Sequence, residues 1–353
     1  MVIFIKENTF EYKKWNVKRC KKMLKRRTKR KIKLKNLKKD FNYLPKYKKF
    51  GMRTLCKIFK APKNFSIEEN VEETFKFFEE IFKYIRSNPS NTNNKTIYVD
   101  SSEVLKVSES TLMYLYAVIN DVKFSNYDIS GNHPKNPDVK ELYRRIGFNR
   151  LLRRRKVEQK EYDGGNVLIY RGDSVNPALT ATACKFITSK SDIKKAEIYG
   201  PVIELMGNTV QHAYSDYEKL EKKWQIFVKN DKEGINFIFL DTGKGIPGTV
   251  RKNKLELLKK VFPTVLNYNE SEILKSAFEG KFRTRTNLEN RGKGLPQIHE
   301  LMLSKSITQA AVYSGKSMCK IINNKEFYSN LPVEFYGTLY EFTILRSVGD
   351  EIY

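Results

Sequence analysis

ELMGNTVQHA, residues 204–213, is the most informative stretch of this 353-residue chain. Apolar side chains recur every three to four residues into and through it, which predicts a helix. The residues at this spacing are Ile198, Val202, Leu205 and Thr209. Glu204, Asn208 and His212 follow each other at four-residue intervals and so share one face of that helix. A carboxylate, a carboxamide and an imidazole in a row indicate that this face has a polar function.

Two glycine-containing segments follow this helix. DTGKGIP, residues 241–247, comes directly after INFIFL, residues 235–240, whose apolar run predicts a strand. NRGKGLPQI, residues 290–298, places a Gly-Lys-Gly step before a helical run, where backbone N–H groups can hold an anion. Together the three segments indicate an ATP pocket. They supply a carboxylate that can accept a hydrogen bond from a nucleobase, an amide oxygen that can bind a metal ion, and a glycine-rich turn that can hold phosphates.

In this order, the three segments resemble the N box, G1 box and G2 box of the GHKL nucleotide-binding fold. This Bergerat fold is shared by gyrase B, the large heat-shock chaperones, histidine kinases, MutL and the anti-sigma serine kinases. The resembling core runs from about residue 192 to residue 346, and a Gly-Thr pair, Gly337 and Thr338, completes it. Each motif alone is common, so their order carries the resemblance. The resemblance implies an α/β sandwich that binds ATP and Mg²⁺.

The resemblance also implies a role for each matching residue. Asn208 matches the magnesium ligand, and one carboxamide suffices because Mg²⁺ keeps phosphate oxygens and water as its other ligands. Glu204 matches the general base of the ATP-hydrolysing members, with a plain solvent-facing acid as the alternative. Asp241 matches the carboxylate that accepts from the adenine amino group. The other matches are Gly243 and Gly245 beside the adenine ring, Arg291, Gly292, Lys293 and Gly294 in the lid over the phosphates, and Thr338, which reaches adenine through water.

Residues 61–155 predict a second, smaller α/β unit, because short strand and helix patterns alternate through it. The predicted elements are a helix over 71–86, a strand over 96–100, a helix over 112–119, a strand over 127–130 and a helix over 137–147. This unit resembles the STAS domains of anti-sigma-factor antagonists. Alignment on SESTLMYLYAVI, residues 108–119, puts Glu109 where the antagonists carry the serine that takes a phosphate. Ser108 and Ser110 are expected to cap the helix.

Positive charge is concentrated near the N-terminus. Residues 1–60 hold 23 Lys and Arg against three acids, in a chain with a formal net charge of +27. Residues 13–39 contain 16 bases and no acid. Such a block repels itself unless it meets a polyanion, so RNA or DNA is its expected partner. An acidic protein partner and a merely solubilising tail remain as alternatives.

Composition narrows the class of protein further. Hydrophobic residues make up 40% of the chain and aromatic residues 12%, which is enough for packed cores. The four cysteines, Cys20, Cys56, Cys184 and Cys319, show no zinc-site spacing and indicate reduced thiols in the cytoplasm. No apolar run approaches the 18 residues of a membrane span, so no membrane partner is expected.

The expected organisation is a basic arm (1–60), a STAS-like domain (61–155), a linker (156–175), a GHKL ATP-binding domain (176–348) and a short tail (349–353). The favoured function is a slowly hydrolysing Mg-ATP switch that couples nucleotide state to the STAS-like domain and the polyanion-binding arm. The first alternative is a serine protein kinase of the anti-sigma type, which sends phosphate to a serine or to its own STAS-like unit. The STAS-like domain is also a candidate site for a protein partner. The second is a nucleic-acid-binding protein that senses nucleotide without hydrolysis.

Overall fold

The computed structural model describes residues 55–87, 95–121, 127–148, 160–162, 166–213, 223–253, 255–262, 269–282 and 294–347. All of them belong to one compact unit, residues 55–353. They form helices and three β-sheets, so the predicted mixed α/β class is confirmed. The basic block at 13–39 and the tail at 349–353 lie outside the described residues.

The strands and helices have the following bounds. The strands are β1 (Leu55–Lys60), β2 (Asn64–Phe65), β3 (Lys95–Asp100), β4 (Lys106–Val107), β5 (Tyr127–Gly131), β6 (Lys160–Tyr162), β7 (Val167–Gly172), β8 (Trp224–Asp231), β9 (Gly234–Asp241), β10 (Ile307–Ile322) and β11 (Lys325–Ile344). The helices are α2 (Val71–Ser87), α3 (Glu109–Asn120), α4 (Pro137–Arg145), α6 (Pro177–Thr188), α7 (Lys195–Asn208), the π-helical turn η4 (Thr209–Ala213), α8 (Gly245–Asn253), α9 (Leu255–Val261), α10 (Glu270–Phe278) and α11 (Gly294–Met302).

Local sequence explains several helix starts. Ser108 accepts from the backbone N–H of Thr111 and is the N-cap of α3, as predicted, whereas Ser110 lies buried inside the first turn and caps nothing. Asn136 and Asn176 cap α4 and α6 in the same way. In both of these helices a proline occupies the first turn, where its missing N–H costs no hydrogen bond.

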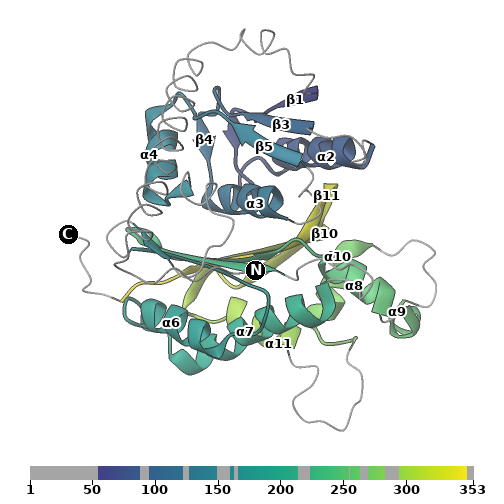
Figure 1. Ribbon diagram of the computed structural model, residues 1–353. Helices are drawn as coiled ribbons and strands as arrows, with labels where there is room; N and C mark the ends of the chain where they lie inside the picture. Colours follow the sequence, from purple (N-terminus) through teal and green to yellow (C-terminus); the bar gives the residue numbers. More distant parts are fainter. Residues whose placement is uncertain are drawn as a thin grey trace, which may run out of the picture. The chain divides into compact units, whose positions relative to one another are not determined.

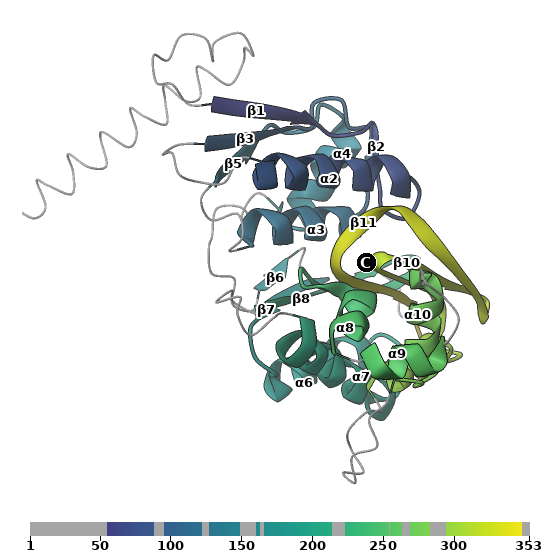
Figure 2. The same ribbon diagram turned by 90° about the vertical axis from the view of Figure 1, so that its right-hand side faces the viewer.

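The N-terminal part contains a three-stranded parallel sheet in the order β1-β3-β5. Helices α2 and α3 lie between this sheet and a larger one (Figures 1 and 2). Strand β1 occupies residues that the charge pattern assigned to the arm. Residues 55–60 form a strand because they pair along their whole length with β3, a tertiary contact that composition does not encode.

The larger sheet has six strands in the order β10-β11-β9-β8-β7-β6, and every neighbouring pair is antiparallel. The predicted strand over 235–240 is confirmed as β9. Strands β6 and β7 fall within residues 156–175, which were expected to be a linker. The apolar run that begins at Val167 is buried and pairs with β8, so these residues complete the sheet.

Both faces of the six-stranded sheet are covered. One face packs Trp224, Phe237 and Phe239 against apolar side chains of α6, α7, α10 and α11. The other face packs Leu240 and Leu339 against α2 and α3 of the N-terminal layer, here defined as residues 55–148. Helices of the two layers appear on opposite sides of the sheet in Figure 1. The N-terminal layer therefore shares a hydrophobic core with the sheet.

Polar contacts join the N-terminal layer to the same face. The Tyr114 hydroxyl donates to the carbonyl oxygen of Tyr336 at 3.1 Å. Lys229 Nζ on β8 lies 2.6 Å from Glu109 Oε1 and 2.8 Å from Asp231 Oδ2. The side chains of Lys229 and Glu109 are only 11% and 17% exposed, so this ion pair is largely removed from water. Glu109, at the position aligned with a phosphoacceptor serine, thus holds α3 against the sheet.

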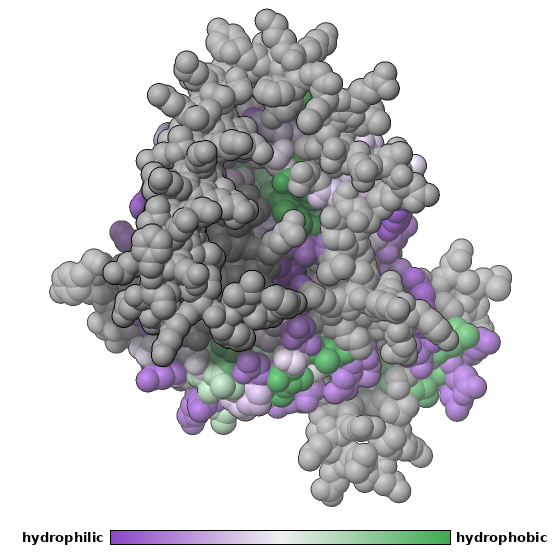
Figure 3. Space-filling model, in the orientation of Figure 1, coloured by the Kyte–Doolittle hydropathy of each residue, from purple (hydrophilic) through white to green (hydrophobic). Residues whose placement is uncertain are grey.

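None of the helices in the described part of the chain combines the length and the apolar character needed to cross a membrane. Figure 3 shows hydrophilic and hydrophobic residues interspersed along the lower helical layer. Among the described residues, the large apolar side chains that are exposed are Ile58, Leu105, Val175, Leu255, Ile322, Phe327 and Leu345. Single exposed apolar residues of this kind are common on protein surfaces.

Candidate functional site

A row of polar side chains crosses three neighbouring strands of the large sheet. Ser314 on β10 is the register partner of Thr338 on β11, and Thr338 is the partner of Asp241 on β9. Residues directly opposite one another point to the same face of a sheet. That face is the helix-covered one, because Asp241 continues the alternation of Phe237 and Phe239. The three polar side chains therefore interrupt an otherwise apolar surface.

Asp241 is only 5% exposed, and its carboxylate is held in place from two sides. The backbone N–H of Gly243 donates to Oδ1 at 2.8 Å. The hydroxyl of Thr209 lies 3.3 Å from Oδ2 and 3.1 Å from the carbonyl oxygen of Leu205. Thr209 entered the sequence analysis only as an apolar-face helix position, and its contact with Asp241 depends on tertiary packing.

The predicted helix over residues 204–213 is regular only as far as Asn208. It continues as the π-helical turn η4, a feature often found at functional sites. Glu204 and Asn208 keep their four-residue spacing within α7. His212 lies in this π-helical turn rather than in the α-helix, and it is exposed.

The end of η4 explains one glycine of the second motif. The carbonyl oxygen of Ala213 accepts from the backbone N–H of Lys244 at 2.8 Å. A Cβ atom at Gly243 would lie 2.5 Å from both the Cβ and the carbonyl oxygen of Ala213. Gly243 is thus required for the close approach of the loop after β9 to η4, whatever else the loop binds.

Asn208 has an uncommitted side chain. Its Nδ2 atom is buried and makes no hydrogen bond within the described part of the chain. A buried polar atom without a partner is costly, so such atoms in a folded protein need an explanation. Because a carboxamide can rotate to exchange its oxygen and nitrogen, the Asn208 side chain can offer an oxygen atom to a cation without breaking a structural hydrogen bond.

Glu204 lies beside the first residue of α11. A Cβ atom at Gly294 would clash with Glu204 Oε2, so a side chain there would displace the Glu204 carboxylate. Glu204 is partly buried, and burial raises the pKa of its carboxyl group. A carboxylate beside a helix N-terminus is favoured by the helix dipole. Helices α7 and α11 are therefore in contact at Glu204 and Gly294. Helix α7 carries the predicted general base, and α11 follows the predicted lid.

Ser314 links three segments of the site, and sequence analysis missed it. Its hydroxyl accepts from the backbone N–H of Ile246 at 2.7 Å and lies 3.1 Å from Thr338 Oγ1. Gly245 adopts a φ of 74° and packs so closely that a Cβ would lie 2.9 Å from Ser314 Oγ. Gly337 has a φ of 116°, and a side chain on it would collide with the carbonyl oxygen of Asp241. Ser314 lies far from the three motifs in sequence, so no spacing pattern could have predicted its place in the site.

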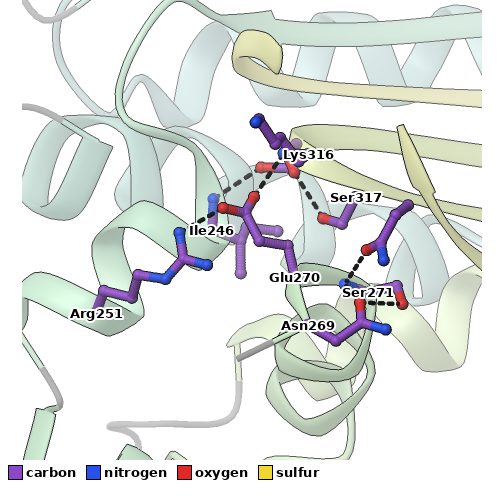
Figure 4. A network of polar contacts seen from close by, with 9 residues as sticks. Ile246, Arg251, Asn269, Glu270, Ser271, Lys316 and Ser317 are labelled. Atoms are coloured by element: carbon purple, nitrogen blue, oxygen red, sulfur yellow. Dashed lines mark hydrogen bonds and ion pairs between the residues drawn. The ribbon is translucent and has the colours of Figure 1, made fainter. Parts of the chain in front are cut away.

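A network centred on Glu270 supports the strand after Ser314 (Figure 4). Glu270 Oε2 accepts from the backbone N–H of Lys316 at 2.5 Å, and Oε1 pairs with Arg251 of α8. Ser317 donates its hydroxyl proton to the carbonyl oxygen of Ser314 at 2.6 Å. The contacts join the first turn of α10, the helix α8 and the irregular pairing of β10 with β11 that follows Ser314.

The remaining predicted site residues, Arg291, Gly292 and Lys293, lie outside the described residues. Within the described ranges, no group of three or more His, Cys, Asp and Glu side chains is arranged to hold a metal ion. The described site brings together Asp241, Thr338 and Ser314 on the sheet, and Glu204 and Asn208 on α7. It can offer a buried carboxylate acceptor, two hydroxyl groups, a free carboxamide and a second, partly buried carboxyl group.

A separate cavity of about 770 Å³ lies away from this site. It is lined by Glu109 and Lys229 together with α4 residues such as Arg144 and with the turn between β8 and β9. Its four acidic and four basic lining residues balance in charge. The cavity follows the junction between the N-terminal layer and the sheet face opposite Asp241.

No protein-family model matches this chain, and no curated protein sequence is significantly similar to it.

Proposed function

We propose that residues 192–346 form a GHKL-type, or Bergerat, domain that binds Mg-ATP and hydrolyses it slowly. The single observation that carries the proposal is the row of Asp241, Thr338 and Ser314, which is joined to the end of α7 by the contact of Thr209, the residue after Asn208, with Asp241. A bound ligand would explain both the carboxylate buried at a strand end on an apolar face and the buried Asn208 Nδ2, which makes no hydrogen bond within the described part of the chain. Three motifs far apart in sequence thus contribute to one face of one sheet.

In this proposal the Asp241 carboxylate accepts from the adenine amino group, and Thr338 contacts the same base. The backbone N–H of Gly243 donates to this carboxylate and orients it as an acceptor. The Asn208 carboxamide oxygen would hold Mg²⁺, with phosphate oxygens and water completing the octahedron that this ion prefers. When bound, Mg²⁺ neutralises part of the charge on the triphosphate.

Glu204 would orient the water that attacks the γ-phosphate. Its position beside Gly294 supports this role, because the N–H groups at the start of α11 can hold an anion. Arg291, Gly292 and Lys293 directly precede α11 and would face the same phosphates. Burial of Glu204 raises the pKa of its carboxyl group, which makes the carboxylate a stronger proton acceptor.

The N-terminal layer is proposed to be STAS-like and to respond to the nucleotide through the sheet. Asp241 and Thr338 face the proposed nucleotide, whereas their chain neighbours Leu240 and Leu339 pack into the N-terminal core. A shift of these strands would therefore change contacts on both faces. Because the N-terminal layer and the sheet share a core, we favour a shift of the strands over a separation of two independent domains. A shift of this kind requires that the nucleotide make different contacts in its two states.

Transfer of phosphate to the chain's own STAS-like layer is disfavoured. Glu109 stands at the aligned phosphoacceptor position and has no hydroxyl group to phosphorylate. It is paired with Lys229 on the sheet face opposite Asp241. A kinase of the anti-sigma type would have to act on a separate protein.

Calorimetry on the full chain with ATP, in the presence and absence of Mg²⁺, tests the proposal. We expect binding that depends on Mg²⁺ and that loses this dependence in Asn208→Ala. A phosphate-release assay, with and without RNA or DNA, then separates hydrolysis from autophosphorylation and from binding alone. Absence of any ATP binding by the folded wild-type chain would overturn the proposed function.

A further inference from the structure

A second group of polar side chains lies on the opposite face of the large sheet, where the N-terminal layer packs. Glu341 on β11 and Asn236 on β9 point to this face, because side chains alternate along a strand. Glu341 comes two residues after Leu339 and Asn236 two residues before Ile238, and both of these apolar residues belong to the core shared with the N-terminal layer. Asn236 Nδ2 donates to Glu341 Oε1 at 3.3 Å and joins the two strands.

Two further polar residues, Glu68 and Ser110, come from the N-terminal layer. The backbone N–H of Ile67 donates to Thr111 Oγ1 at 2.9 Å. The segment before α2 therefore lies against the first turn of α3, which contains Ser110. Lys320 Nζ on β10 donates to the carbonyl oxygen of Glu68 at 3.2 Å. Glu68 is thus fixed between α3 and the sheet.

Glu341 lies at the centre of these groups. Burial, and then the neighbouring Glu68, raise the pKa of the Glu341 carboxyl group, whereas Ser110 and Asn236 lower it. Burial, and then the charges of Glu68 and Glu341, raise the pKa of the Tyr313 hydroxyl on β10. These residues form one cluster, here named the junction cluster: Glu68, Ser110, Asn236, Tyr313 and Glu341.

Three oxygen atoms of the junction cluster are buried and make no hydrogen bond within the described part of the chain. They are Glu68 Oε1, Asn236 Oδ1 and Tyr313 Oη. Glu68 Oε2, in contrast, accepts from the Ser66 hydroxyl at 2.7 Å. Tyr313 is fully buried in the same core, so bulk water does not reach its hydroxyl. Buried oxygens without a partner require an explanation, and a bound ion or water supplies one.

The charge of the junction cluster favours an ion. Two neighbouring carboxyl groups that are removed from water do not both ionise unless a positive charge compensates them. A proton neutralises only one of the two. A divalent cation neutralises both, and it also gives the unpaired amide and hydroxyl oxygens a partner.

We propose that the junction cluster binds one Ca²⁺ ion. Ca²⁺ takes about six to eight oxygen ligands in flexible geometry, and it accepts carboxylates, amide oxygens and water together. Mg²⁺ demands a near-ideal octahedron and keeps several waters, which suits a buried set of protein oxygens less well. The cluster holds only two acidic side chains, and its neutral oxygens complete the ligand set. Such an ion would join the N-terminal layer to β9 and β11.

The cavity of about 770 Å³ provides an entry path to the junction cluster. Asn236 lines this cavity together with its register partner on β11, Thr343. Lys229, the register partner of Asn236 on β8, lines it too. Because Lys229 is paired with Glu109 and Asp231, its charge is already compensated. A cation in the cavity therefore meets the amide oxygen of Asn236 next to the Glu341 carboxylate.

Calorimetry with Ca²⁺ on the full chain, freed of metal by a chelator and without nucleotide, tests the proposal. We expect one tight site in the wild type. Glu341→Gln keeps the shape of the side chain and removes its charge. Loss of a residue that only supports a metal ligand costs about 10–100-fold in affinity, so this variant should weaken Ca²⁺ binding at least tenfold. Glu334→Gln, which replaces an exposed acid on the same strand, is the matched control and should bind like the wild type.

A second variant changes affinity in the other direction. Asn236→Asp adds a third carboxylate and should bind Ca²⁺ more tightly than the wild type, because affinity rises with the number of charged ligands. It keeps the test decisive if Glu341→Gln does not fold by circular dichroism. Unchanged or weaker Ca²⁺ binding in folded Asn236→Asp would contradict the site.

The remaining outcomes are equally distinct. If the folded wild type binds no Ca²⁺, water fills the junction cluster and the proposal is wrong. Weak binding that Glu341→Gln and Glu334→Gln share equally belongs to surface carboxylates and also overturns it. Tighter binding of Mg²⁺ than of Ca²⁺ would overturn the choice of ion. Because the measurement uses no nucleotide, its result does not depend on the proposed ATP site, and Asn208→Ala should keep the Ca²⁺ affinity of the wild type.

Discussion

Thr338 and Asp241 stand directly opposite each other in the antiparallel pairing of β11 with β9. Both are buried, at 6% and 5% exposure, on a face that is otherwise apolar. Gly337, next to Thr338, approaches the backbone of Asp241 so closely that no side chain fits. The sheet therefore brings a carboxylate and a hydroxyl group together at its end, and the predictions below depend on this pair and its neighbours.

Asp241→Asn should weaken ATP binding about ten- to a hundredfold. The substitution removes the charged acceptor for the adenine amino group, and a hydrogen bond to a charged group contributes about 1.5–3 kcal/mol. Calorimetry with Mg-ATP measures the change. Asp192→Asn, an exposed carboxylate before α7, is the matched control and should bind like the wild type. Equal ATP affinity in Asp241→Asn and the control would remove Asp241 from the site.

Glu204→Ala should retain ATP but lose turnover by roughly 10²–10⁴-fold, the usual contribution of a general base. A phosphate-release assay at saturating ATP measures this change. Glu197→Ala provides the control, because Glu197 is an exposed acid on the same helix. Normal turnover in Glu204→Ala would leave Glu204 with a structural role beside Gly294, and would favour a kinase or a nucleotide sensor.

We expect the free energy of unfolding to depend on pH through the carboxyl group of Glu341. Burial, and then the neighbouring Glu68, raise the pKa of the Glu341 carboxyl group well above its ordinary value of 4.5. The folded state therefore holds this proton when the unfolded state has lost it. Its contribution to stability is complete below pH 4.5 and falls as the pH rises toward the folded-state pKa, by up to about 1.4 kcal/mol per pH unit.

Urea denaturation between pH 5 and pH 8 measures this dependence. In Glu341→Gln the free energy of unfolding should depend less on pH, because glutamine does not ionise. Glu334→Gln replaces an exposed acid on the same strand and should keep the wild-type profile. Parallel profiles for Glu341→Gln and the wild type would show that the carboxyl pair does not control stability in this range.

The basic N-terminal block predicts nucleic-acid binding that weakens with salt. If residues 13–39 neutralise about five phosphates of a duplex, log affinity should fall against log salt with a slope of about −4 to −5. Filter binding at several salt concentrations measures the slope, which should depend little on nucleic-acid sequence because the contacts are to the backbone.

The matched variant is a deletion of residues 1–54, which keeps β1 in its sheet. It should flatten the salt dependence and leave ATP binding intact. Binding that is tight but insensitive to salt, or no binding even at low ionic strength, would contradict the nucleic-acid partner.

Local sequence determined the elements that have strong periodicity. The helix over 71–86 and the strands over 96–100, 127–130 and 235–240 are all confirmed within one or two residues. The spacing of their apolar residues predicts which face of each element is buried, even when the element it packs against is unknown. The first motif predicted a helix, and Glu204 and Asn208 do share the last turns of α7.

Tertiary structure determined how those elements pair and pack with one another. Strands β1 and β7 are short, and their sequences form strands because β3 and β8 supply partners from elsewhere in the chain. The last residues of the first motif, Thr209 to Ala213, form a π-helical turn that apolar spacing alone does not predict. Ser314, Thr209 and Glu270 entered the site through sheet register and helix packing, which bring together residues far apart in sequence. Local spacing specifies a face, whereas the pairing of strands specifies which side chains meet on it.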